Sequence, residues 1–128
     1  MLLQSIKENE GFRGTVYKCS EGFDTIGYGT RLPLSKDEAE LLLIHRLEQK
    51  GRELEQKEPF ILKLKHDKQE VILEMCYQMG VDGVLKFKKM WEALKKGDYK
   101  KASVEMLDSA WYMQTPARAK KLSDLMKA

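Results

Sequence analysis

Glu10, Cys19 and Thr25 are the side chains of this sequence whose types and positions offer chemistry. Glu10 stands where a segment with helical spacing of apolar residues meets a segment rich in β-forming residues. A carboxyl group can transfer protons there, although most glutamates are simply solvated. Cys19 and Thr25 lie on either side of a predicted turn and add a thiol and a hydroxyl. We therefore treat this junction as the candidate site.

A β-hairpin is predicted around these residues. Residues 15–18 and 23–26 are rich in β-formers, and a three-residue loop ending in Gly22 separates Cys19 from Phe23. Pairing of Cys19 with Phe23 sets the strand register, and alternation then assigns side chains to two faces. One face carries Tyr17, Cys19, Phe23 and Thr25, and the other carries Lys18 and Asp24. We therefore expect Cys19 and Thr25 to face a common cleft and Asp24 to point away from it.

Helical patterns cover most of the remaining chain. A short helix is predicted at 2–9, and a capping box at Ser35 and Glu38 opens a long helix that Pro59 ends. Apolar stripes then end at glycines 80 and 97, a third runs from residue 99 to 110, and Thr115-Pro116 starts a last helix. We predict an α+β fold, mostly α, in a single domain of residues 1–128. Its expected parts are a small β lobe at about 11–34, a connecting helix at about 36–57 and a helical lobe at about 60–128.

The charge of the chain argues against a nucleic-acid partner. The 128 residues include 23 Lys and Arg against 20 Asp and Glu, which gives a net charge of +3. The balance is −2 in residues 1–59 and +5 in residues 60–128. The ordinary interpretation of the basic second half is a solvated helical surface. The alternative is attraction to an extended anionic polymer.

The remaining composition predicts a chain without metal or membrane segments. The two cysteines, Cys19 and Cys76, make no disulfide framework, and His45 and His66 have no zinc spacing. No apolar run approaches the roughly 20 residues that span a membrane. The start of the chain lacks the basic and apolar regions of a signal peptide. We expect a product of the cytoplasm with no metal, no stable membrane association and no signal peptide.

Three groups of residues resemble the phage-type lysozymes, the muramidase endolysins of glycoside hydrolase family 24, which include the T-even phage lysozymes. The first group is EGFR at 10–13, YK at 17–18, EG at 21–22 and TIGYG at 25–29. The second is Gln69 with YQMG at 77–80. The third is WY at 111–112, QTP at 114–116 and RAK at 118–120. The resemblance covers nearly the whole chain and implies a lysozyme-like fold, in which the third strand and the loops of the β lobe are trimmed.

The resemblance implies catalytic roles. The family's spacing is Glu, eight residues, Asp, five residues, Thr, and here it reads Glu10, Cys19, Thr25. Glu10 then corresponds to the general acid, and Thr25 positions the hydrolytic water. Cys19 replaces the Asp and can act as a thiolate base or as a nucleophile, which favours a lowered thiol pKa. Lys18 and Arg13 are nearby in sequence. The alternative is a small apolar side chain at this position, with catalysis lost.

Further residues are implied with less support. Arg118 resembles the arginine that pairs with the catalytic Glu. Tyr77 matches an aromatic of the cleft wall, although core packing explains it equally well, and Gln78 offers an amide to the glycan. Arg31, Met90 and Glu105 fall at substrate-contacting positions without matching the usual residues. Thr30 replaces the family's usual His.

The resemblance also implies the function. We expect a cofactor-free, monomeric peptidoglycan hydrolase that cleaves the β-1,4 bond between N-acetylmuramic acid and N-acetylglucosamine, in host lysis or defence. Without a signal peptide, it would need a holin or another export route to act on the wall in the periplasm. The alternatives are a catalytically impaired peptidoglycan-binding protein and a lytic transglycosylase. A helical nucleic-acid binder is disfavoured by the modest net charge.

Overall fold

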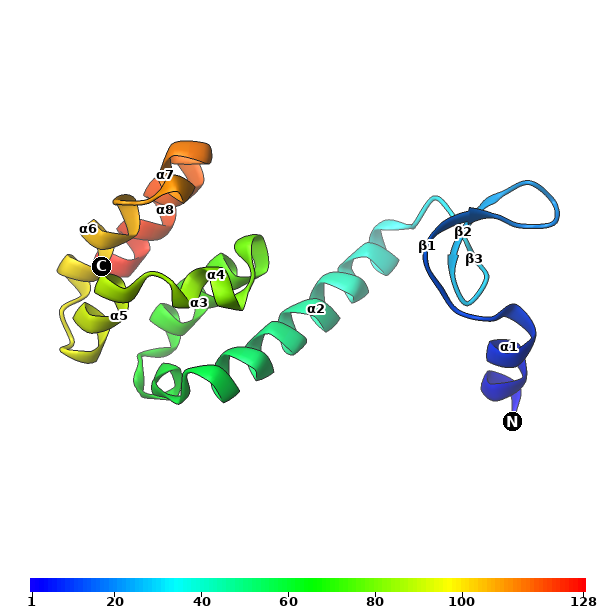
Figure 1. Ribbon diagram of the computed structural model, residues 1–128, viewed down its shortest axis with the longest axis horizontal. Helices are drawn as coiled ribbons and strands as arrows, with labels where there is room; N and C mark the ends of the chain where they lie inside the picture. Colours follow the sequence, from blue (N-terminus) through cyan, green and yellow to red (C-terminus); the bar gives the residue numbers. More distant parts are fainter. The chain divides into compact units, whose positions relative to one another are not determined.

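The computed structural model describes all residues, 1–128, and contains eight α-helices, one 3-10 helix and a three-stranded antiparallel sheet (Figure 1). This confirms the predicted α+β class with a mostly helical chain. The residues form two compact units, Met1–Leu42 and Leu43–Ala128. The boundary falls within the long helix α2 (Lys36–Lys57). No helix combines the length and the apolar character that a membrane crossing requires.

The first unit begins with helix α1 (Leu2–Glu10) and continues into strands β1 (Arg13–Lys18), β2 (Asp24–Gly27) and β3 (Thr30–Arg31). The strands pair in the order β1-β2-β3. Tyr17 pairs with Thr25 and Lys18 with Asp24, which confirms the predicted hairpin register. The third strand is retained but has only two residues, consistent with a trimmed β lobe.

The hairpin turn closes as its glycine predicts. The N–H of Cys19 donates to the carbonyl of Phe23 at 2.9 Å, and the N–H of Gly22 donates to the carbonyl of Cys19 at 2.9 Å. Gly22 has φ +85°, a conformation that side chains other than glycine rarely adopt. On the opposite face, Lys18 and Asp24 form an ion pair at 2.7 Å. Asp24 is thereby engaged away from Cys19, as the strand alternation requires.

Helix α2 begins at the predicted capping box. Ser35 Oγ accepts from the N–H of Glu38 at 3.1 Å, and Glu38 Oε1 accepts from the N–H of Ser35 at 2.9 Å. These bonds to the backbone and side chain of Ser35 lower the pKa of Glu38. The reciprocal cap satisfies two backbone donors that a helix start otherwise leaves open. It fixes where the chain passes from the β lobe into α2.

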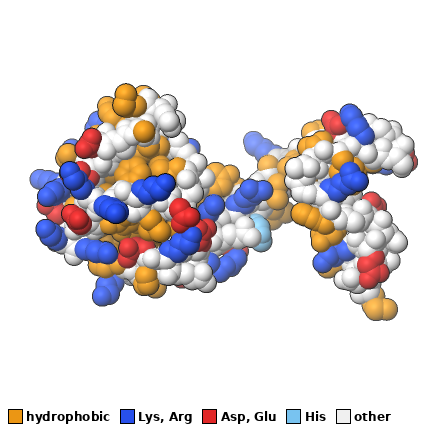
Figure 2. Space-filling model, viewed as in Figure 1, with side chains coloured by type: hydrophobic (Ala, Val, Ile, Leu, Met, Phe, Trp, Pro, Cys, Tyr) orange, Lys and Arg blue, Asp and Glu red, His pale blue; other side chains and the backbone are white.

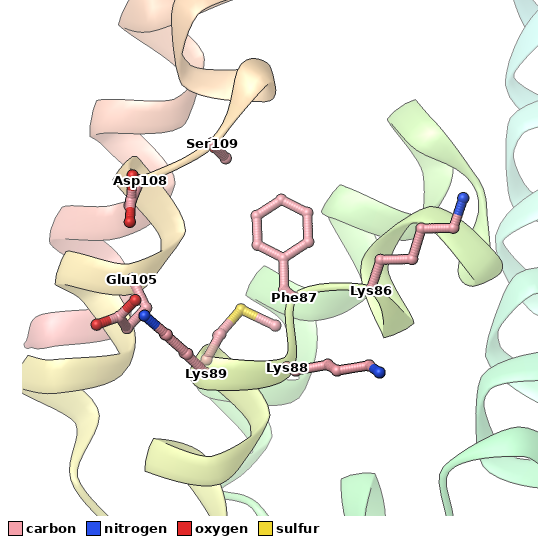
Figure 3. A pocket seen from close by; sticks show the side chains of 8 residues that line it. Lys86, Phe87, Lys88, Lys89, Glu105, Asp108 and Ser109 are labelled. Carbon is pink, nitrogen blue, oxygen red and sulfur yellow. The ribbon is translucent and has the colours of Figure 1, made fainter.

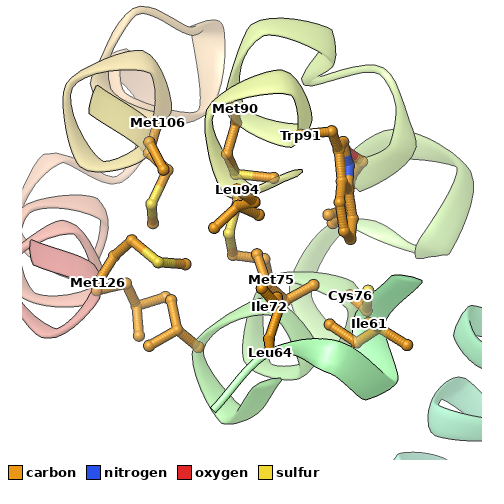
Figure 4. Close-up of a cluster of buried hydrophobic side chains, with 14 of the residues drawn as sticks. Ile61, Leu64, Ile72, Met75, Cys76, Met90, Trp91, Leu94, Met106 and Met126 are labelled. Atoms are coloured by element: carbon orange, nitrogen blue, oxygen red, sulfur yellow. The ribbon is translucent and has the colours of Figure 1, made fainter. Parts of the chain in front are cut away.

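The second unit packs short helices around one apolar core, part of which Figure 4 shows. Side chains from α3, α5, α6 and α8 meet there, among them Met75, Met90, Met106 and Met126. After α2, the elements are η1 (Pro59–Lys63), α3 (His66–Met79), α4 (Val81–Leu85), α5 (Lys88–Lys95), α6 (Tyr99–Leu107), α7 (Ala110–Gln114) and α8 (Pro116–Lys127).

Two details of the helical pattern differ from the sequence prediction. The third apolar stripe divides into α6 and α7, because Ser109 starts a new helix by accepting from the N–H of Tyr112 at 3.2 Å. Helix α8 begins at Pro116 as predicted, but the Thr115 hydroxyl does not cap it. It donates instead to the carbonyl of Trp111 at 3.2 Å. Local hydrogen bonds therefore decide where these helices break.

Trp91, Trp111 and Cys76 lie in the apolar core of the second unit. A charged side chain is also buried there: Lys68 on α3 is almost fully enclosed, and its ammonium donates to the carbonyl of Leu125 at 2.8 Å. This bond satisfies one of the open carbonyls in the last turn of α8.

Replacing Gly22 and Gly51 by alanine should change stability in opposite directions. Neither added Cβ meets an atom within 4 Å, so backbone conformation alone decides the effect. At Gly22 the positive φ should cost about 1 kcal/mol. At Gly51, within α2, alanine should add about 0.5–1 kcal/mol. Urea unfolding followed by circular dichroism measures both variants. A Gly22→Ala protein as stable as the native chain would contradict the predicted turn.

Candidate active site

Glu10, Cys19 and Thr25 all belong to the first unit, on three neighbouring segments. Glu10 is the last residue of α1, Cys19 directly follows β1, and Thr25 lies in β2. Thr25 is 1% exposed and is the only buried residue among residues 1–42. A hydroxyl therefore occupies the place of least exposure in this unit, while Cys19 is half-buried and Glu10 is exposed.

The carbonyl oxygen of Phe23 links two of these residues. It accepts from the N–H of Cys19 at 2.9 Å and from the hydroxyl of Thr25 at 2.8 Å. A carbonyl has two lone pairs, so both bonds can form together. The Thr25 hydroxyl hydrogen can also turn toward the Cys19 sulfur. The thiol and the hydroxyl are thereby held on one face of the hairpin, as predicted.

The surroundings of Cys19 favour its thiolate. A hydrogen bond from the backbone of Phe23 is the main cause that lowers the thiol pKa. Partial desolvation opposes it, whereas the backbone of Glu21, the Thr25 side chain and the positive charge of Arg31 lower the pKa further. The cation that contributes is Arg31, whose effect is the smallest of these five. Hydrogen bonds to sulfur stabilise its charged form.

Gly29 meets the carboxyl group of Glu10. Gly29 has φ +76°, and a Cβ added to it would lie 2.5 Å from Oε2 of Glu10. The backbone of the β2–β3 turn therefore lies close beside the Glu10 carboxylate. A side chain at position 29 would collide with that carboxylate unless it moved. A glycine permits this close approach because it has no Cβ. The neighbouring group is the carboxyl of Glu10, at the end of α1.

Arg31 lies at the turn that carries Cys19. Its Nη2 donates to Oε2 of Glu21 at 2.6 Å, and its guanidinium carbon lies 4.5 Å from the ring centroid of Phe23. On β3, Arg31 also pairs with Thr25. A general substrate-contacting role was expected for this residue, but these three contacts were not. A positive charge two residues after Gly29 was the only signal in the sequence.

Tyr77 and Gln78 lie near the end of α3 in the second unit. Tyr77 is 41% exposed, so its ring is available to a ligand. The amide of Gln78 is engaged within the protein: its oxygen accepts from Trp111 Nε1 at 2.9 Å, and its nitrogen donates to Thr115 at 3.2 Å. Gln78 therefore joins α3 to α7 and to the start of α8. One N–H and one lone pair of the amide remain for a ligand.

Met90 and Glu105 line a shared cavity of about 330 Å³ in the second unit (Figure 3). Its other lining residues are Lys86, Phe87, Lys88, Lys89, Asp108 and Ser109. Met90 is 0% exposed, so a ligand would have to reach it through this cavity. The lining combines ammonium, carboxylate and hydroxyl groups with the Phe87 ring. Such a mixture suits a polar ligand that has apolar faces.

Charged side chains of both signs cover the second unit. On the face in Figure 2, lysines and arginines alternate with acidic residues around apolar patches.

Arg118 on α8 donates through Nε to Oε2 of Glu74 on α3 at 3.0 Å. Its guanidinium has four further N–H donors. No group of three or more His, Cys, Asp or Glu side chains is arranged to hold a metal ion.

The two cysteines should differ in reactivity. Burial raises the pKa of Cys76 to about 12, whereas hydrogen bonds lower that of Cys19. Iodoacetamide should therefore modify Cys19 in the native protein with a pH midpoint below that of an ordinary thiol, because the thiolate is the nucleophile. Mass spectrometry across a pH series measures this, with Cys76 as internal control. Equal labelling of both thiols would contradict the described environments.

Comparison with known proteins relates both units to lysozymes. Probable T4-type lysozymes 1 and 2 of Dictyostelium discoideum are 25% and 26% identical to this chain over 95% and 94% of its length. The matches cover 91% and 90% of those proteins. The pre-baseplate central spike protein Gp5 of Enterobacteria phage T4 is 27% identical over 95% of this chain, which spans only 27% of that longer protein. The family model described as phage lysozyme matches residues 7–127. Since this match extends through both units, the chain belongs to the phage lysozyme family.

Proposed function

We propose that this protein is a peptidoglycan hydrolase that cleaves the β-1,4 bond between N-acetylmuramic acid and N-acetylglucosamine. The observation that carries the proposal is that Cys19 and Thr25 share the carbonyl of Phe23, while the Glu10 carboxyl lies beside Gly29 in the next turn of the same sheet. Membership of the phage lysozyme family supports the same reaction class. The reaction needs no cofactor, because a proton donor, a base and water suffice for glycoside hydrolysis.

Glu10 is the proton donor in this mechanism. It transfers a proton to the glycosidic oxygen, which leaves with its electron pair from the anomeric carbon. The turn at Gly29 restricts where the Glu10 carboxyl can lie, and a fixed position is what proton transfer requires. Arg118, which pairs with Glu74 in the structure, is proposed to support the acid through its remaining donors.

Cys19 completes the reaction as a thiolate. As a base it takes a proton from water, whose oxygen bonds to the anomeric carbon, and the product is inverted. As a nucleophile its sulfur bonds to that carbon first, and water then releases a retained product. Both routes require the thiolate, which its hydrogen-bonded environment favours. The lone pairs of the Thr25 hydroxyl accept a hydrogen bond from the water, whether its hydrogen is directed to Phe23 or to the Cys19 sulfur.

The remaining candidates are proposed to bind the glycan. Tyr77 offers an exposed ring for stacking on a sugar face. Glu105 and Met90 act through their cavity, whose size and mixed polarity suit a sugar substituent. Gln78 holds Trp111 in place and has one N–H for the substrate.

The setting follows from the substrate. We propose that the protein acts as a monomer on the wall in the periplasm, in host lysis or antibacterial defence, after release through a holin or another export route. The basic balance of residues 60–128 favours approach to an anionic wall.

Substitutions of Cys19 and Glu10 test the mechanism. Glu10→Gln removes the acid and Cys19→Ala removes the thiolate, so both should abolish clearing of permeabilised Gram-negative cells. Cys19→Asp should keep or raise activity, because a carboxylate is ionised at neutral pH. Turbidity measures all three between about pH 5 and 9, which spans plausible thiol pKa values. Undiminished lysis by Cys19→Ala would remove the thiol from the mechanism.

Product analysis distinguishes the alternatives. Hydrolysis adds one water to the products, whereas a lytic transglycosylase leaves an anhydro sugar of lower mass. The anomeric configuration of the wild-type product shows which role Cys19 has: inversion indicates a base and retention a nucleophile. The product of Cys19→Asp serves as the comparison. Wall binding by the wild type without turnover at any pH would favour a binding protein over an enzyme.

Alanine at Gly29 should damage activity more than alanine at Gly27. The two glycines have φ +76° and +70°, so the backbone strain is similar. Only at position 29 does the added Cβ meet Glu10, and nothing lies within 4 Å at position 27. Displacing the acid by about 1 Å can cost on the order of 100-fold in rate. Lysis rates of the two variants at matched stability give the comparison, and equal rates would show that the Gly29 contact does not position Glu10.

A further inference from the structure

We propose that Arg31 is a positioning residue of this site, which holds the turn carrying Cys19 through Glu21 and Phe23 and presents its positive charge to the thiolate. The proposal rests on the proposed function, since it assigns a regulating role within the same site. It differs from the substrate-contacting role that the position of Arg31 in the sequence implies.

The contacts of Arg31 bridge the hairpin turn. Its guanidinium bonds to Glu21, inside the three-residue loop, at 2.6 Å. The same group lies over the ring of Phe23, the first residue after the loop, at 4.5 Å. Backbone pairing of Arg31 with Thr25 fixes the base of its side chain. One side chain on β3 therefore contacts the turn on both sides of Gly22, and Cys19 begins that turn.

The ion pair is too exposed to contribute much stability. The side chains of Arg31 and Glu21 are 53% and 63% exposed. Exposed ion pairs contribute about 0–1 kcal/mol, because water screens the charges and two long side chains must be ordered. The effect of Arg31 should therefore appear in the geometry and ionisation of the turn rather than in the unfolding free energy.

Arg31, held at the turn by Glu21 and Phe23, also adds a small electrostatic contribution that favours the thiolate. The other charged groups around the turn are Glu21, which Arg31 neutralises, and the Lys18–Asp24 pair on the opposite face of the hairpin. Arg13 lies over the ring of Tyr17 at 4.8 Å. The charge of Arg31 lowers the pKa of Cys19, and removal of Arg31 would also leave the Glu21 carboxylate without its partner. Both consequences disfavour the thiolate.

The first test measures the thiol without requiring activity. The pH midpoint of Cys19 alkylation is compared in Arg31→Met, Glu21→Gln and Lys18→Met, with circular dichroism to confirm folding. Arg31→Met should raise the midpoint, whereas Glu21→Gln should not, because it removes a negative charge. Lys18→Met is the matched control: it deletes one cation from the same hairpin on the opposite face and should leave the midpoint unchanged. An unchanged midpoint in Arg31→Met would overturn the proposal.

The second test separates positioning from substrate binding. In Arg31→Met, the acidic limb of the pH–rate profile should shift to higher pH, and kcat below that limb should fall by about tenfold, with KM nearly unchanged. Arg31→Lys should restore the position of the limb but only part of kcat, because an ammonium does not reproduce a planar guanidinium on an aromatic ring. A raised KM with an unshifted profile would instead assign Arg31 to the substrate and refute the proposal.

The two tests also separate this inference from the proposed function. If the wild-type chain releases no product from peptidoglycan, the proposed hydrolase function fails. The alkylation series still tests Arg31 in that case, because a raised midpoint in Arg31→Met against an unchanged Lys18→Met would support its action on the turn.

Discussion

The carbonyl oxygen of Phe23 is the acceptor on which the candidate site depends. It accepts hydrogen bonds from the backbone N–H of Cys19 and from the hydroxyl of Thr25. The backbone of Phe23 also supplies the hydrogen bond that most lowers the pKa of the Cys19 thiol. The first unit has little apolar burial to fix these side chains, since Thr25 is its only buried residue. Directed hydrogen bonds therefore set the geometry that a packed core sets elsewhere.

The two cysteines illustrate how environment determines chemistry. Cys76 lies in the apolar core, where burial raises its pKa to about 12 and leaves it an inert small side chain. Cys19 lies on a hairpin turn, where hydrogen bonds from the backbone and from Thr25, together with the charge of Arg31, lower its pKa. In the proposed mechanism, this thiolate supplies the negative charge at the site, because its surroundings lower its pKa.

The second unit has a different physical basis. Its apolar core contains side chains from several helices, and buried polar groups within it are paired, as Lys68 is with Leu125. Gln78 connects α3 to Trp111 and Thr115. A rigid helical unit of this kind can present Tyr77 and the cavity lined by Glu105 in fixed positions. The family relationship covers this unit as well as the first.

The sequence by itself determined the elements with strong local signals. The capping box of Ser35 and Glu38, the glycine turns and the alternation of the hairpin were all predictable, because each depends on residues a few positions apart. Spacing within the chain also selected Glu10, Cys19 and Thr25 as candidate site residues. Lys68 lies four residues before Ile72 on the apolar stripe of α3, but a lysine there carries no signal of its partner on α8.

Only the tertiary structure decided which groups meet across segments. The contact of Gly29 with Glu10, the bond of Arg31 to Glu21 and the use of the Gln78 amide all join residues whose pairing depends on backbone paths and rotamers. The Thr115 hydroxyl likewise accepts from the Gln78 amide on α3, a partner 37 residues away in the chain. A residue type states which hydrogen bonds a side chain can form, but the folded chain determines which partners come within reach.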